Sequence, residues 1–217
     1  QIMGTLPSVL LSESLQTLSL AENKLSGNIP SEILSLPKLS VLNLNNNSLE
    51  GPLPDFSKGS ESLYFLDFGF NNISSVLPGN IGEFPSLSLL ILHQNNLTGQ
   101  IPDSIGELTK LEFLSLFGNE LTGTIPKSLA KLTKLQTLQL SQNLLSGEIP
   151  EIFSELRNLY RLDLGINLLE GKLPETFNEL DSIEFLRLDN NQLSGPIPDI
   201  FTNLTHLKVL SLSGNEL

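Results

Sequence analysis

Residues 108–155 read LTKLEFLSLFGNELTGTIPKSLAK and then LTKLQTLQLSQNLLSGEIPEIFSE, two 24-residue segments with one shared pattern of leucine, asparagine, glycine and proline. The pattern continues toward both ends of the 217-residue chain, with no slip between Leu15 and Leu207. One of its apolar positions is filled in turn by Leu15, Leu39, Leu63, Leu87, Leu111, Leu135, Leu159, Ile183 and Leu207. A fixed period of this length indicates a repeat protein, in which each unit packs on its neighbours.

The first half of each repeat has the pattern L-x-x-L-x-L, as in Leu111, Leu114 and Leu116. The last two leucines are two residues apart, and side chains at this spacing in a strand point to the same side of a sheet. One repeat cannot bury its apolar side alone, whereas a stack of repeats forms a continuous core. The pattern therefore predicts short strands with their leucines turned inward.

An asparagine follows the predicted strand in every repeat. These residues are Asn23, Asn47, Asn71, Asn95, Asn119, Asn143, Asn167, Asn191 and Asn215. A buried asparagine amide offers two N–H donors and one acceptor oxygen, which can hold the backbone where the chain turns away from the sheet. We therefore expect these asparagines to be structural.

The second half of most repeats contains G-x-[IL]-P, as in Gly123 to Pro126 and, near the C-terminus, Gly195 to Pro198. Glycine permits a left-handed backbone, and proline marks the exit from a sheet. Apolar residues usually follow three and six positions after the proline, as at Leu129 and Leu132, and this spacing predicts a short 3₁₀ or helical segment.

Two repeats depart from the pattern. Ser75 stands where glycine is expected, and Ser57 and Ser60 stand at two of the usual apolar positions. We expect Phe56 to fill the resulting gap from a shifted backbone. The convex side should therefore be irregular near residues 55–62.

The string L-x-x-L-x-L-x-x-N-x-L-x-G-x-I-P resembles the plant-type leucine-rich repeat of receptor-like kinases, receptor-like proteins and polygalacturonase-inhibiting proteins. The resemblance covers residues 2–217 and implies an α/β repeat solenoid: a right-handed superhelix with a parallel concave β-sheet, a second short sheet, and a 3₁₀ or helical convex side. We expect one domain over residues 1–217, comprising a partial repeat (1–14), eight repeats (15–206) and a partial repeat (207–217). The family's cysteine-pair caps are missing, so a segment of a longer stack is expected.

Composition argues against several classes of function. The formal net charge is −12, which disfavours nucleic acid and anionic lipid as partners. The chain has no cysteine, no run of about 18 apolar residues, and no catalytic or metal-binding motif. We therefore expect neither catalysis, cofactor nor metal, and no membrane insertion by this segment.

The predicted concave face is unusually apolar in the middle of the stack, where its expected ligand-binding residues are Phe65, Phe70, Leu89, Ile91, His93, Phe113 and Phe117. Neighbouring strands lie about 4.8 Å apart, so these side chains should form one contiguous patch, and such patches often mark interfaces. Alternatively, the row formed by Phe65, Leu89 and Phe113 packs sideways on its neighbours. That alternative does not apply to Phe70, Ile91 or Phe117.

A second set of candidate ligand-binding residues lies further along the same face. It comprises Tyr160, Arg161, Phe185 and Arg187, with Asp163 and Asp189 close by in the repeat pattern. Local ion pairing is one interpretation of this cluster. A bidentate site for a carboxylate or sulfate of the ligand is the other.

The resemblance leads to three hypotheses about function. The first is a receptor ectodomain at the cell surface, which binds a peptide or protein ligand. A co-receptor is a further candidate partner under this hypothesis. The others are a secreted inhibitor of a cell-wall-degrading glycosidase and a structural or assembly subunit of a larger complex. A secretory location would permit glycosylation at the N-x-[ST] sequences of Asn46, Asn72, Asn96 and Asn203.

Overall fold

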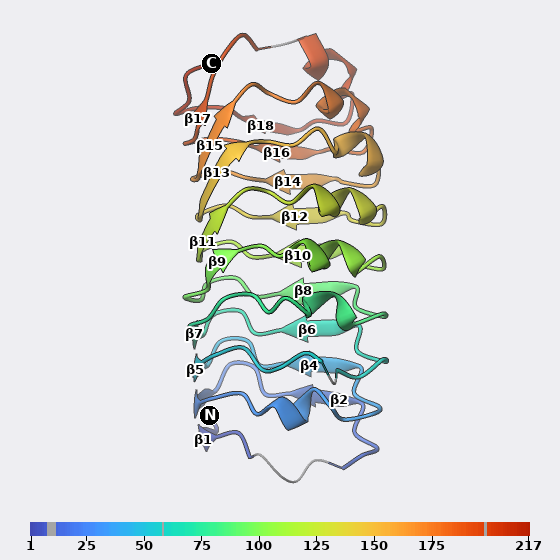
Figure 1. Cartoon of the computed structure of the whole chain (residues 1–217), viewed down its shortest axis with the longest axis vertical. Coiled ribbons are helices and arrows are strands. Elements are labelled where there is room, and N and C mark those ends of the chain that lie inside the picture. Colours follow the sequence, from blue (N-terminus) through green and yellow to red (C-terminus); the bar gives the residue numbers. More distant parts are fainter. Residues whose placement is uncertain (8–11, 58, 198) are drawn as a thin grey trace.

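The computed structural model describes residues 1–7, 12–57, 59–197 and 199–217, so Pro198 of the last G-x-I-P segment lies outside the described residues. The repeats form a stack of coils of similar size, with the N-terminus at one end and the C-terminus at the other (Figure 1). Each coil contributes one strand to the same long sheet. The repeat solenoid predicted from the sequence is confirmed.

The long sheet is parallel and, within the described residues, contains nine strands. In chain order they are β2 (Thr17–Ser19), β4 (Val41–Asn43), β6 (Phe65–Asp67), β8 (Leu89–Ile91), β10 (Phe113–Ser115), β12 (Thr137–Gln139), β14 (Arg161–Asp163), β16 (Phe185–Arg187) and β18 (Val209–Ser211). Their pairing is in register with the 24-residue period, since Leu90, Leu114 and Leu138 are Cα partners. We call the solvent side of these nine strands and of the three residues after each strand the strand face.

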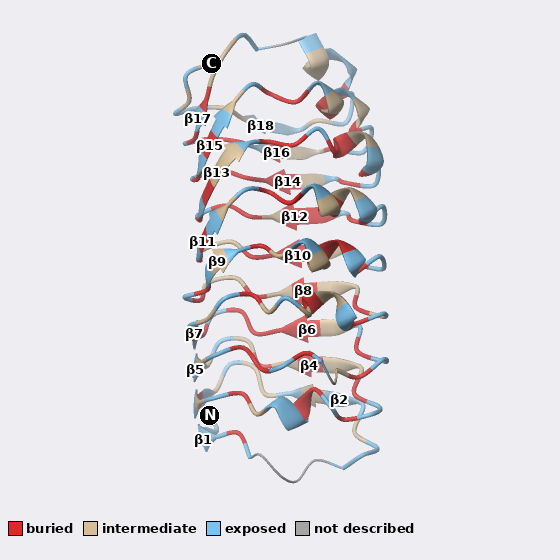
Figure 2. Cartoon of the chain, viewed as in Figure 1, coloured by how far each residue is buried: buried red, intermediate tan, exposed pale blue. Residues whose placement is uncertain are grey.

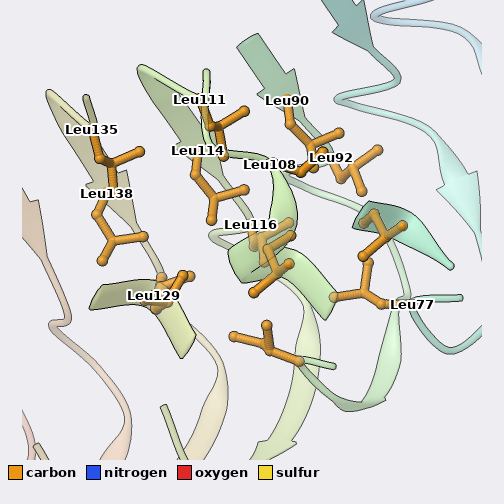
Figure 3. Close-up of a cluster of buried hydrophobic side chains, with 14 of the residues drawn as sticks. Leu77, Leu90, Leu92, Leu108, Leu111, Leu114, Leu116, Leu129, Leu135 and Leu138 are labelled. Carbon is orange, nitrogen blue, oxygen red and sulfur yellow. The ribbon is translucent and has the colours of Figure 1, made fainter. Parts of the chain in front are cut away.

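The inner side of the nine-stranded sheet carries the leucine core. Leu111, Leu114 and Leu116 have no solvent-exposed surface, and the equivalent residues of the neighbouring repeats are also buried. Figure 3 shows these leucines pointing to the same interior, where Leu108 and Leu129 meet them from outside the nine-stranded sheet. Buried residues accordingly form an inner band through the successive coils (Figure 2).

The asparagines hold the backbone where the chain turns away from the sheet, as predicted, and they also join each coil to the one before it. The Oδ1 atom of Asn119 accepts a hydrogen bond from the backbone N–H of Leu97 at 3.0 Å. Its Nδ2 atom donates to the carbonyl oxygens of Leu92 (3.1 Å) and Leu116 (3.0 Å). The residue before each asparagine has a positive φ, for example 55° at Gln142, so the chain turns sharply here.

The G-x-I-P halves form short parallel strands beside the long sheet, and in the described residues they fall into two sheets. The first contains β1 (Met3–Thr5), β3 (Lys24–Gly27), β5 (Ser48–Gly51) and β7 (Asn72–Ile73), and the second contains β9 (Thr98–Gln100), β11 (Glu120–Gly123), β13 (Leu144–Glu148), β15 (Leu168–Gly171) and β17 (Gln192–Leu193). The expected second sheet is therefore present but divided. The division falls at Ser75, which lacks the positive φ of about 75° that Gly51 and Gly99 adopt beside it.

The segments after the prolines are 3₁₀ helices packed on the leucine core. The described ones are η1 (Ser31–Ile33), η2 (Ile81–Glu83), η3 (Asp103–Glu107), η4 (Lys127–Lys131), η5 (Phe153–Glu155), η6 (Glu175–Glu179) and η7 (Asp199–Asn203). In the described part of residues 52–62 no such helix forms. Phe56 is buried there and its ring meets that of Phe84 edge-on at 5.3 Å, so the predicted replacement of the missing apolar residues is confirmed.

Candidate functional site

The first row of the strand face contains Phe65, Leu89 and Phe113, which are successive Cα partners in β6, β8 and β10. All three side chains are only half-buried. The row is therefore aligned as predicted, and its partial burial fits both the interface interpretation and the sideways-packing alternative. Ile91, in the next row of β8, is likewise half-buried, so the apolar surface extends across two rows.

An aromatic ladder runs beside these rows, formed by Phe70, His93 and Phe117 from three consecutive repeats. The Phe70 ring meets the His93 ring edge-on at 4.9 Å between centroids, and the His93 ring stacks on Phe117 at 4.6 Å. Phe70 is 49% exposed and has a φ of 52°. Because Gly69 has no side chain, His93 can lie over it: a Cβ there would be 2.8 Å from the His93 Nε2 atom. The ladder thus depends on a glycine in the preceding repeat.

Asp67 and His93, the middle ring of the aromatic ladder, form a pair of interacting ionisable groups. Asp67 is buried, and its Oδ1 atom accepts hydrogen bonds from the Gly69 backbone N–H (2.8 Å) and from Asn45 (3.3 Å). Burial raises the pKa of Asp67 above 3.8, although the hydrogen bonds and the charge of His93 act in the opposite direction. Burial also lowers the pKa of His93 below 6.5, which the negative charge of Asp67 partly offsets. His93 Nδ1 lies 3.1 Å from Ser115 Oγ.

We predict that His93 makes stability depend on pH. Its lowered pKa means that the folded chain binds fewer protons than the unfolded chain below about pH 6.5, so stability is lost as pH falls through this value. Asp67 has the opposite sign, because its raised pKa adds stability as pH falls toward 3.8. Thermal unfolding between about pH 7.5 and about pH 5.5 should therefore show a smaller loss for His93→Gln than for the wild type. Equal losses in the two proteins would contradict this assignment.

A charged cluster lies further along the strand face, on β14 and β16. Arg187 lies between two carboxylates, with Nη1 4.0 Å from Asp163 Oδ2 and Nε 3.6 Å from Asp189 Oδ1. The guanidinium of Arg161 lies over the half-buried ring of Phe185, 5.6 Å from its centroid. Local ion pairing, one of the two interpretations of this cluster, thus describes Arg187. Binding of a ligand anion stays a prediction.

Several surface residues near these groups were not predicted from the sequence. Tyr160 was predicted and is exposed beside β14, but Leu144, Ile166 and Leu168 are also exposed apolar side chains, at the edge of the strand face. Ile166 has a φ of 55°, a backbone conformation that is unfavourable for a β-branched residue. Its signal in the sequence was an isoleucine at a position that most repeats give to Asn, Gln, Glu or Gly.

The four candidate glycosylation residues all have exposed side chains. Asn46 lies in the turn before β5, Asn72 lies in β7, Asn96 precedes β9 and Asn203 ends η7. Each is therefore accessible to a modifying enzyme, although none is shown to be modified.

Two further properties concern metals and membranes. Among the described residues, no group of three or more His, Cys, Asp and Glu side chains is arranged to hold a metal ion. The described helices also include none with the length and apolar character needed to cross a bilayer.

The sequence matches family models of leucine-rich repeats over most of its length. The model described as "Leucine rich repeat" matches residues 61–121, 85–145 and 133–193, and "Leucine Rich repeats (2 copies)" matches residues 13–58. A comparison with curated proteins gives no match.

Solved structures provide close structural neighbours. The ectodomain of the Arabidopsis thaliana receptor kinase GASSHO1/SCHENGEN3, in complex with CASPARIAN STRIP INTEGRITY FACTOR 2, is 36% identical with a TM-score of 0.94, over 98% of this chain and 26% of that one. The Arabidopsis receptor kinase HAESA, in complex with the peptide hormone IDA and the co-receptor SERK1, is 34% identical with a TM-score of 0.78, over 98% of this chain and 40% of that one.

A bacterial protein has the same fold. The leucine-rich repeat protein LIC12759 of Leptospira interrogans is 36% identical with a TM-score of 0.81, over 94% of this chain and 50% of that one. The chain thus spans half or less of the length of these three neighbours. The repeat pattern, the stacked coils and these matches agree, and the chain belongs to the leucine-rich repeat family, of the type found in plant receptor ectodomains.

Proposed function

We propose that this chain is a recognition module that binds a peptide or protein ligand on its strand face, as part of the ectodomain of a cell-surface receptor. The observation that carries the proposal is the aromatic ladder of Phe70, His93 and Phe117, which is continuous across three repeats and partly open to solvent. Exposed aromatic surface on a rigid backbone suits recognition, because rings contribute large contact areas and lose little conformational entropy.

The proposed site has two parts. The apolar part consists of Phe65, Phe70, Leu89, Ile91, His93, Phe113 and Phe117, and the charged part consists of Tyr160, Arg161, Phe185 and Arg187. The two parts are neighbours, since Phe117 and Arg161 line the same hollow. A ligand that follows the strand face from β6 to β16 would therefore contact both parts.

The structural neighbours support this function and suggest the setting. Their names describe a receptor-kinase ectodomain with CASPARIAN STRIP INTEGRITY FACTOR 2, and HAESA with a peptide hormone and a co-receptor. By analogy, we propose an extracellular location and a co-receptor as the second partner. Asn46, Asn72, Asn96 and Asn203 are the proposed glycosylation sites in that setting.

The proposal predicts that ligands depend on the aromatic ladder. Peptides selected from a random display library against the wild-type chain should bind Phe70→Ala/Phe117→Ala at least about tenfold more weakly, since two anchoring rings are removed. Affinity would be measured by surface plasmon resonance.

The control is Val76→Ala, which removes an exposed apolar side chain outside the strand face. It should leave the affinity of the selected peptides unchanged. Equal binding to the wild type and to Phe70→Ala/Phe117→Ala, with the fold verified by circular dichroism, would refute the proposed site.

A further inference from the structure

The charged part of the strand face contains a hollow of about 200 Å³ between β12, β14 and β16. It is open because Gly165 has no side chain at a position that the neighbouring repeats give to Ser141 and Asp189. Two carboxylates and two arginines are among the residues that line it: Asp163, Asp189, Arg161 and Arg187. We call it the Gly165 hollow.

The two carboxylates of the Gly165 hollow are incompletely satisfied. Each of Asp163 and Asp189 is only 7% exposed. Asp189 Oδ1 is buried and accepts no hydrogen bond from the described residues, and its nearest cationic nitrogen, Arg187 Nε, is 3.6 Å away. Asp163 Oδ2 lies 4.0 Å from the same guanidinium. The other oxygen of each carboxylate has a partner, since Asp163 Oδ1 accepts from the Gly165 N–H at 3.3 Å and Asp189 Oδ2 accepts from Asn190 at 3.0 Å. One oxygen of each therefore has only the distant Arg187 guanidinium, and a better-placed donor would stabilise it.

The lining of the Gly165 hollow also includes two apolar residues, beside the polar side chains of Gln139, Ser141 and Gln142. The apolar residues are Phe117, the last ring of the aromatic ladder, and Ile166. Ile166 is 48% exposed and keeps its unfavourable positive φ, so its side chain presents apolar surface to solvent where glycine would give an unstrained turn. A hollow lined by both apolar side chains and carboxylates matches a ligand side chain with an aliphatic stem and a cationic end.

We infer that the Gly165 hollow binds an arginine or lysine side chain of the ligand, with its stem against Phe117 and Ile166 and its cation on Asp163 and Asp189. This inference rests on the proposed function and names the chemistry of one ligand residue. The side chain of Arg187 is 47% exposed and can turn into solvent when the ligand cation arrives.

A ligand anion fits the same hollow less well. The cation of Arg161 already lies over the Phe185 ring, and that of Arg187 lies between the two carboxylates. A carboxylate or sulfate placed there would approach two buried negative charges in a chain of net charge −12. A cation would be attracted by the same two carboxylates, so the observations favour a basic ligand residue.

The test is a nuclear magnetic resonance titration of the isotopically labelled 217-residue chain. Three acetylated and amidated tripeptides serve as probes: alanine-arginine-alanine, the same peptide with neutral citrulline, and alanine-glutamate-alanine. The arginine peptide should shift the amide signals of Gly165, Ile166 and Asp189. The citrulline peptide should bind about tenfold more weakly, because charge-assisted hydrogen bonds are lost.

Two substitutions should change the binding of the arginine peptide in opposite directions. Asp189→Asn should weaken binding of the arginine peptide about tenfold, whereas Arg187→Gln should strengthen it by removing the competing cation. Asp163→Asn provides a second variant with the same expectation as Asp189→Asn. The control is Asp67→Asn, at the same repeat position as Asp163 but outside the hollow, which should leave binding unchanged.

The inference fails if the glutamate peptide binds more tightly than the arginine peptide and loses affinity in Arg187→Gln. It also fails if the arginine peptide shifts none of these signals, or shifts them equally in Asp189→Asn. Library peptides that still depend on Phe70 and Phe117 would then show that the proposed function holds without a basic-residue site. If instead the library peptides bind independently of Phe70 and Phe117 while the arginine peptide binds as expected, the basic-residue site holds and the proposed ladder site fails.

Discussion

Replacing Asn119 with alanine is expected to lower the free energy of unfolding by about 3–5 kcal/mol. Asn119 is buried in the middle of the stack, and its amide binds backbone groups of two repeats. Alanine would remove these hydrogen bonds without admitting water. The N–H of Leu97 and the carbonyl oxygens of Leu92 and Leu116 would then be left with fewer partners in the core, and each unsatisfied buried group costs about 1–3 kcal/mol.

The expected loss is large because the amide cannot be replaced by any group nearby. Its oxygen accepts from the Leu97 N–H of the preceding repeat, just before β9, while its nitrogen donates to the carbonyl oxygens where the chain leaves the long sheet. Aspartate at position 119 retains the acceptor but places negative charge against those carbonyl oxygens. We therefore expect Asn119→Asp to be at least as destabilising as alanine at neutral pH.

Asn23 provides the matched control, because it occupies the same repeat position but is only half-buried. It makes similar bonds to the Ile2 N–H and to the Leu20 carbonyl, where water can substitute for the lost amide. Asn23→Ala should therefore cost about 1 kcal/mol. Urea unfolding followed by far-ultraviolet circular dichroism measures both variants. A loss of less than about 1 kcal/mol for Asn119→Ala would contradict the structural role of the asparagines.

Features that recur in every repeat could be predicted from the sequence, because every coil must bury its leucines and turn at its asparagine. The alignment of Phe65, Leu89 and Phe113 follows from the strand period and the fixed repeat length, and the strand pairing confirms it. The division of the second sheet at Ser75 was not predicted. The sequence showed that a glycine was missing there, but whether the neighbouring backbone could adjust to a negative φ depended on the packing of a whole coil.

The residues of the candidate site could be predicted from the sequence, but the contacts between them could not. Phe70, His93 and Phe117 were all expected on one face, but the sequence did not show that His93 would stack between the two phenylalanines. That arrangement depends on the space over Gly69, which only the packed coils define. Arg161 and Arg187 were likewise expected together. Their different partners, a ring and two carboxylates, depend on side-chain rotamers and not on the repeat period.

Replacing Phe153 with alanine is expected to lower the free energy of unfolding by about 3–5 kcal/mol, the second large effect. Phe153 begins η5, has no exposed surface, and packs its ring against that of Phe177 at 4.7 Å between centroids. Most other repeats place isoleucine or leucine at this position, such as Leu129 in η4. The neighbouring coils are held by the asparagines and cannot close around the missing ring, so a cavity should remain.

Two further variants separate the effect of the cavity from that of the lost ring contact. Phe153→Leu introduces the residue found at the equivalent position of η4. It should lower the free energy of unfolding by about 1–1.5 kcal/mol, because most of the side-chain volume is retained. Phe201→Ala, at the same repeat position in η7, should cost less than Phe153→Ala because Phe201 is only half-buried and leaves a smaller cavity. Urea unfolding at a single temperature compares the three. Equal losses for Phe153→Ala and Phe201→Ala would mean that cavity formation does not govern stability at this position, since burial is the main difference between the two sites.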